Sequence, residues 1–362
     1  MRLLHLRLFV VAIAVVLPLG ELARACSVPV FRYALERWTP DRYHAVVFHA
    51  GSLSADQRAA LDVLQRAQAA GRANLDVHVA DLDGQMTEGL RTLWDAQPGR
   101  TPWLVLLYPT SMAGDREIWA GPLTTKAATA LVDSPARRAI AERIAVGQTA
   151  VWVLIEPPGR AGAAAGVLEE QLAAGPDVLA LPPELMEASP HLTSRLRIEF
   201  SLLRIKRDDP EEAILLAMLL GTEPDLERDY RDVPIAIPIY GRGRTLLAMV
   251  GPGIVPENVL AGCRFLVGRC SCEIKAQNLG VDLLFDYPWR DALEVSLVDM
   301  VELPQPIAEP VGEPPSDMVA APVAAPSPPV LLRNVLFTGG FIVVAAVVIG
   351  LLAFRRTGRT RP

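Results

Sequence analysis

Two hydrophobic segments, one at each end, restrict the folded body of this chain to the residues between them. At the N-terminus an almost purely apolar run, Leu3–Leu19, follows a basic residue and leads to the small-residue site Ala23–Ala25. This order is typical of a secretory signal peptide, here residues 1–25, so we expect export and a mature chain that begins at Cys26. The alternative is a lipid on Cys26, but Arg24 fits a lipoprotein site poorly.

The second segment, Val335–Phe354, contains 20 residues without a charge. At about 1.5 Å per residue, a helix of this length crosses the ~30 Å hydrocarbon layer. Arginines and no acids follow it, so the positive-inside rule places residues 355–362 in the cytoplasm. We therefore expect a transmembrane helix over residues 331–354. The protein would be a single-pass cell-membrane protein with its body outside the cytoplasm, in the periplasm where an outer membrane exists.

A proline-rich stretch separates the body from this predicted anchor. Nine prolines lie among the 27 residues of segment 303–329. Such a stretch cannot pair into a sheet or continue a helix, and it favours an extended, semi-rigid conformation. Residues 303–330 are thus predicted to be a linker that holds the body away from the bilayer.

Charge and cysteine content narrow the function classes. The net charge is −6, and the basic residues cluster only in the C-terminal tail. A chain without a basic face is not expected to bind nucleic acid. All four cysteines lie in the predicted exported part, where disulfides persist, and four cysteines allow three pairings.

The body shows the same order of predicted elements twice, strand, helix, strand, helix, strand, strand, helix, after one short helix over residues 31–38. Ser54 is a good N-cap and Gly71 a good helix stop, while Pro135 and Pro210 suit first helical positions. The first half has strands at 45–49, 75–80, 103–108 and 117–120 and helices at 54–70, 87–94 and 124–146, the last broken near 133–135. The second half has strands at 150–155, 197–206, 235–240 and 245–250 and helices at 162–174, 209–220 and 256–267.

This order, with a proline directly before the third strand of each half, resembles the thioredoxin fold. In that family a cis-proline precedes the third strand and faces the active site; Pro102 and Pro234 are similar to it in position. Segment 76–81 is similar to the family's second strand with its closing acid. The resemblance covers most of residues 45–268. It implies an α/β protein with two tandem thioredoxin-like domains, residues 26–149 and 150–302, each a mixed sheet flanked by helices.

The family's redox motif is missing from both halves. Redox enzymes of the family carry Cys-x-x-Cys where the first strand meets the first helix, because the helix N-terminus stabilises a thiolate. Here segments 49–53 and 156–160 occupy these places and contain no cysteine. The family's catalytic residues therefore have no counterpart, which favours a protein that is not an enzyme and needs no cofactor. His49 remains at that edge, as a base or ligand or as an ordinary edge histidine.

Cys270-Ser271-Cys272, with Cys263 seven residues earlier, is the densest reactive group. A Cys-x-Cys pair forms a strained disulfide, or it offers two thiolates to Cu(I) or Zn. The alternative is a set of structural disulfides, for example one that joins Cys26 to the second half. These four cysteines are the candidate catalytic (Cys26, Cys270, Cys272), disulfide or metal residues.

Two functions follow. The first is a membrane-tethered binding or scaffold protein that recognises a protein partner at the membrane. The second is an extracytoplasmic protein that handles thiols and disulfides, or thiol-bound metal, through Cys270 and Cys272.

Overall fold

The computed structural model describes residues 28–112, 116–158, 162–183, 196–269, 275–278 and 280–292, all within one compact unit that spans residues 1–304. The predicted signal peptide, Cys26, the proline-rich linker, the transmembrane helix 331–354 and the basic tail lie outside these residues. Within the ranges given, every helix is too short or too polar to cross a membrane.

The first sheet has the strand order β2-β1-β3-β4. Its strands are β1 (Tyr43–His49), β2 (Leu75–Asp81), β3 (Trp103–Leu107) and β4 (Glu117–Pro122). β1 and β2 run parallel, whereas β3 pairs antiparallel with both β1 and β4. The sheet is therefore mixed.

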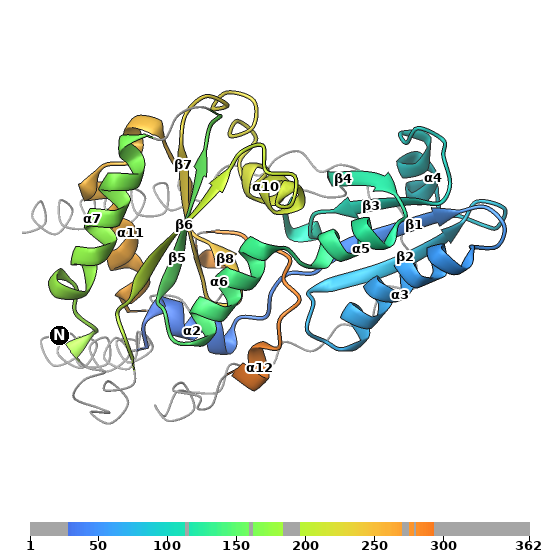
Figure 1. Cartoon of the computed structure of the whole chain (residues 1–362). Coiled ribbons are helices and arrows are strands. Elements are labelled where there is room, and N and C mark those ends of the chain that lie inside the picture. The colour runs from blue at the N-terminus through green and yellow to red at the C-terminus, as the bar shows by residue number, and fades with distance from the viewer. Residues whose placement is uncertain are drawn as a thin grey trace, which may run out of the picture. The chain divides into compact units, whose positions relative to one another are not determined.

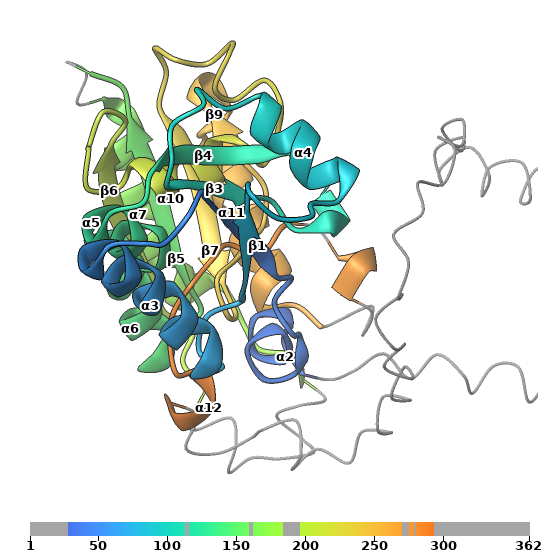
Figure 2. The same cartoon turned by 90° about the vertical axis from the view of Figure 1, so that its right-hand side faces the viewer.

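Helices cover both faces of this sheet. α3 (Ala55–Ala69) and α5 (Thr125–Val132) lie side by side on one face, and α4 (Glu88–Asp95) covers part of the other (Figure 2). Because side chains alternate along a strand, Val47 packs towards α3, whereas Phe48 packs against Trp94 of α4 at 5.3 Å between ring centroids. α3 begins with a reciprocal capping box between Ser54 and Gln57, as its sequence predicts.

The second sheet repeats this pairing. β5 (Ala150–Glu156) runs parallel to β6 (Phe200–Lys206) and antiparallel to β7 (Ile235–Tyr240), which pairs antiparallel with β8 (Arg244–Thr245) and β9 (Met249–Val250). Each half is thus mixed α/β with a sheet flanked by helices, which is consistent with a thioredoxin-like fold.

Two helix layers enclose the second sheet (Figure 1). α7 (Ala163–Val178) and α11 (Pro256–Val267) pack on the face that carries Trp152. α6 (Pro135–Ala145) and α10 (Ala213–Leu220) pack on the face that carries Val153. The remaining helices are α2 (Val30–Arg37) and α12 (Trp289–Ala292), with short 3-10 turns at Thr110–Met112, Gly251–Gly253 and Lys275–Gln277.

At each end of the body, the chain packs against the sheet that is farther away in the sequence. α2 precedes the first sheet in sequence, but Phe31 and Trp38 are buried in the same cluster as Trp152 of the second sheet. Conversely, Leu283–Phe285 follow the second sheet and pack in a core cluster with Tyr43 of the first. That cluster contains side chains of both sheets, so the two halves share one continuous core.

The helix predicted over 209–220 begins later than its sequence suggests. Asp209 accepts a hydrogen bond from the backbone N–H of Glu211 at 3.0 Å, and it forms a turn rather than the first cap of a helix. α10 begins only at Ala213, with Glu212 as its N-cap residue. The buried Glu212 carboxylate instead accepts from the N–H of Ala136 at 2.7 Å, at the start of α6.

Candidate functional site

The β1–α3 connection, where redox enzymes of the thioredoxin family carry Cys-x-x-Cys, is in this chain a loop without a thiol that is closed by hydrogen bonds. Gly51 adopts a left-handed φ of 61°, and its N–H donates to the Asp83 carboxylate at 2.9 Å. His49 donates from Nδ1 to the carbonyl of Gly51 at 2.9 Å, while its own carbonyl accepts from Leu82 at 2.8 Å. His49 therefore orders the loop, as the edge-histidine interpretation predicts.

The helix N-terminus behind this loop is already capped. The Ser54 hydroxyl accepts from the N–H of Gln57 at 3.3 Å, and the Gln57 side chain accepts from the N–H of Ser54 at 2.8 Å. In a redox site such donors would stabilise a thiolate. Here side-chain oxygens accept from the N–H groups of Ser54 and Gln57, so these two donors are not free to stabilise a thiolate.

The two marker prolines differ in conformation. The Thr101–Pro102 bond is cis, as the resemblance implies, whereas Val233–Pro234 is trans. At the matching edge of the second half, Glu156 pairs with Arg204 at 2.7 Å, and residues 159–161 lie outside the described part. The second half therefore departs further from the family pattern.

Of the four cysteines, Cys263 is described, and it carries a free thiol buried in α11. Burial raises the pKa of this thiol to about 12. A protonated, buried thiol is a poor nucleophile and metal ligand. Cys26, Cys270 and Cys272 lie outside the described residues, and within the described part no three or more His, Cys, Asp or Glu side chains converge to hold a metal ion.

We expect Cys263 to resist alkylation in the native protein. Iodoacetamide at pH 8 should leave this residue unmodified, because the reactive thiolate is suppressed by its burial, and should modify it once the chain is unfolded in urea. Mass spectrometry of tryptic peptides measures both states. Rapid native modification of Cys263 would contradict its burial.

The raised pKa of Cys263 also predicts that the free energy of unfolding falls as pH rises above about 9, because the unfolded thiol loses its proton before the folded one does.

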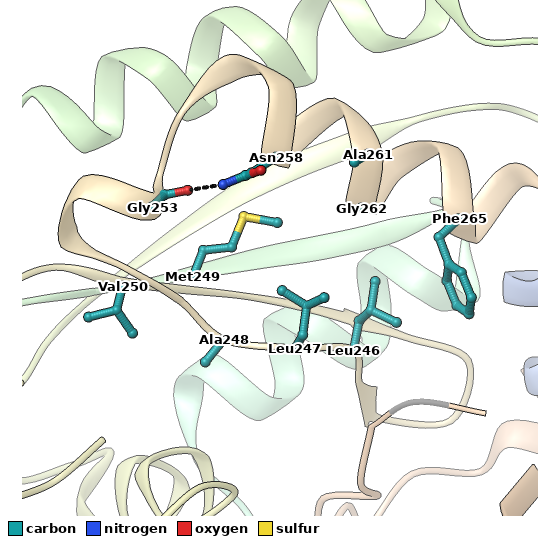
Figure 3. A pocket seen from close by; sticks show the side chains of 10 residues that line it. All are labelled: Leu246, Leu247, Ala248, Met249, Val250, Gly253, Asn258, Ala261, Gly262 and Phe265. Atoms are coloured by element: carbon teal, nitrogen blue, oxygen red, sulfur yellow. Dashed lines mark hydrogen bonds between the residues drawn. The ribbon is translucent and has the colours of Figure 1, made fainter. Parts of the chain in front are cut away.

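An apolar cavity of about 410 Å³ lies between α11 and the edge of the second sheet (Figure 3). Pro238 explains its position. The carbonyl of Pro238, on β7, accepts from the N–H of Leu246 at 3.0 Å. In an antiparallel strand the N–H of that same residue would donate to the same neighbouring strand, but proline has no N–H. The predicted strand 245–250 is therefore split into β8 and β9. Between them three residues, 246–248, face two on β7, which is a bulge.

The lining of this cavity is built for an apolar occupant. Its main side-chain polar group, the Asn258 amide, donates to the carbonyl of Gly253 at 2.9 Å. Leu247, on the bulge, is 37% exposed although it is a large aliphatic side chain. The other lining residues are Leu246, Ala248, Met249, Val250, Ala261, Gly262 and Phe265. Sequence patterns missed this cavity, and the only signal for it was a proline inside a central strand.

Comparisons with known proteins add little. No protein-family model and no curated protein matches this chain. One solved structure that is similar contains the first two thioredoxin domains of Naumovozyma dairenensis Eps1p. The match has 11% sequence identity and a TM-score of 0.18, and it covers 57% of this chain and 87% of that chain. A TM-score this low carries no argument, so the fold description rests on the strand order and pairing given above.

Proposed function

We propose that this chain is a membrane-tethered, extracytoplasmic binding or scaffold protein built on two thioredoxin-like domains without redox chemistry. The observation that supports it best is the β1–α3 connection. There a capped helix N-terminus and a loop closed by hydrogen bonds stand where redox enzymes of the thioredoxin family carry their thiols. The predicted signal peptide, linker and helix 331–354 would hold the body outside the cytoplasm. Its partner would be a protein at the membrane.

A thiol-exchange assay tests the redox half of this proposal. The full chain, purified in detergent, should accelerate reduction of insulin by dithiothreitol no more than an equal concentration of an unrelated membrane protein. The reason is that no described thiol is both exposed and activated. Turnover at enzymatic rates would refute the scaffold function.

The cavity beside Leu247 is the surface that fits a protein partner, because it accepts an apolar side chain at a sheet edge. A photo-crosslinking amino acid at position 247 should give one discrete adduct in intact cells. The same amino acid at Val146, which is 80% exposed but far from the cavity in the fold, should give none. Ala261→Trp fills the cavity from its exposed rim and should abolish the adduct. If position 146 gives the same adduct, or if Ala261→Trp leaves it intact, the cavity is not the binding surface.

One observation favours the alternative, a thiol or thiol-bound metal function. Pro29 forms an antiparallel bridge with Arg269, and Val30 donates to the carbonyl of Gly268 at 3.0 Å. Cys26 lies three residues before this bridge and Cys270 one residue after it, and consecutive Cα atoms are about 3.8 Å apart. The bridge therefore pairs the described ends of the two segments whose sequences lead to Cys26 and to Cys270. This pairing of the two segments supports a structural disulfide as well as thiol chemistry.

Free thiols in the non-reduced, full-length protein distinguish these possibilities. A Cys26–Cys270 or Cys26–Cys272 disulfide that resists mild reductant supports a structural bridge. A labile Cys270–Cys272 pair supports exchange, in which the two thiols become a disulfide while a partner's disulfide becomes two thiols. In that case Cys270→Ser should remove exchange without a change in the unfolding midpoint. A large fall in that midpoint would point to the bridge.

A further inference from the structure

Two histidines and an acid share one open patch of the first sheet. His44 lies on β1, and Asp76 and His78 lie on the edge strand β2. The register pairs His44 with Asp76 and Val46 with His78, so all three side chains project from the same face. This is the face that α4 covers, but α4 packs near Phe48 and Ala80, at the opposite end of the strands. The histidine end stays accessible, and His78 is exposed.

The two imidazoles approach at the separation that a tetrahedral metal requires. His44 Nδ1 and His78 Nε2 are 3.3 Å apart, and the ring centroids are 5.5 Å apart. Zinc–imidazole bonds of about 2.0–2.1 Å at a tetrahedral angle place two ligand nitrogens roughly 3.3–3.4 Å from each other. We propose that His44 and His78 form a two-imidazole binding site for a first-row divalent cation such as Zn²⁺ or Ni²⁺, with water completing the coordination.

Asp76 lies opposite His44 in the register and offers a carboxylate beside the proposed two-imidazole site. Arg42 donates to its carboxylate at 2.8 Å. Arg42 therefore occupies this carboxylate. Release from Arg42 would let an oxygen join two nitrogens, a common set for divalent transition metals.

Calorimetric titration of the full chain, purified without a histidine tag, tests this site with Ni²⁺ as the probe and Mg²⁺ as the hard-cation control. We expect one Ni²⁺ per chain and no Mg²⁺ at this site, because Mg²⁺ prefers oxygen ligands. His44→Gln and His78→Gln should each weaken binding by at least about tenfold, the lower end of what even an outer-shell partner contributes. His49→Gln, a partly buried histidine on the same strand, is the matched control and should leave the affinity unchanged.

Two further variants separate this site from the cysteines and test the role of Asp76. The double variant Cys270→Ser/Cys272→Ser should keep the Ni²⁺ affinity. Arg42→Gln should tighten binding, and Asp76→Asn added to it should remove that gain. Thermal unfolding confirms that each variant is folded. The proposal is overturned if both histidine variants bind Ni²⁺ as the wild type does, or if only the cysteine variant loses binding.

Discussion

Gly280→Ala is expected to lower the free energy of unfolding by about 3–5 kcal/mol. This is the largest effect that we predict for adding one methyl group to a described residue. Gly280 has a left-handed φ of 100°, and a Cβ there would lie 1.7 Å from the carbonyl oxygen of Thr245 and 2.8 Å from its carbon. Both atoms belong to backbone, so no side-chain rotation relieves the overlap. Urea denaturation of the full chain, followed by tryptophan fluorescence, measures the loss.

The surrounding hydrogen bonds explain why the backbone cannot move aside. Thr245 donates to the carbonyl of Val281 at 2.8 Å, and its hydroxyl accepts from the N–H of Val281 at 3.1 Å. Displacing Gly280 would therefore break the hydrogen bonds between Thr245 of β8 and Val281.

Gly166→Ala is the matched control for this change. Gly166 lies within the exposed face of α7, and an added Cβ would meet nothing within 4 Å. Alanine should stabilise this helix by about 0.5–1 kcal/mol, because glycine loses more backbone freedom on folding. Equal, small effects of the two substitutions would show that the segment around Gly280 is not fixed against β8.

Local signals in the sequence predicted most of the regular elements. The buried runs that form β1, β5 and β7 are continuous and apolar, and capping residues such as Ser54 and Ser134 mark the helix starts. These signals depend on neighbours within a few residues, so a single sequence carries them. Asp209 shows their limit, because an acid before a proline suits a turn as well as a helix cap.

Contacts between distant residues could not be predicted in this way. Tyr108 of the first half donates to the carbonyl of Ala217 in α10 at 3.0 Å, and the Asn74 side chain donates to the carbonyl of Leu283 at 3.2 Å. No periodicity links such positions. The His44–His78 pair was missed for the same reason, since its geometry depends on the register of β1 with β2.

Asp282→Ala is expected to destabilise the protein by about 3–5 kcal/mol, because it removes one partner of a buried ion pair. The Asp282 carboxylate accepts from Arg244 at 3.1 Å, from Lys275 at 2.7 Å and from the N–H of Asp41 at 2.8 Å. Its side chain is 5% exposed and that of Arg244 is 6% exposed, so water replaces the lost carboxylate poorly. The same denaturation measurement should show a lower midpoint.

The position of Asp282 makes this loss global rather than local. The N–H of Asp41, two residues before β1, donates to the Asp282 carboxylate at 2.8 Å, while Arg244 belongs to β8 of the second sheet. The acid therefore joins both sheets through the segment that returns from the second half. We expect unfolding to remain a single transition, with its midpoint shifted for tryptophans of both halves alike.

Two controls show whether burial is the cause. Asp229→Ala removes the exposed pair with Arg228, whose side chain is 72% exposed, and should leave the midpoint unchanged because such pairs are screened by solvent and salt. Asp282→Leu combined with Arg244→Met replaces both buried charges with apolar groups. It should be less destabilising than the sum of the single changes, because no charge of that pair remains buried. Strict additivity would mean that Asp282 acts through its other contacts, with Lys275 and Asp41, rather than through its pairing with Arg244.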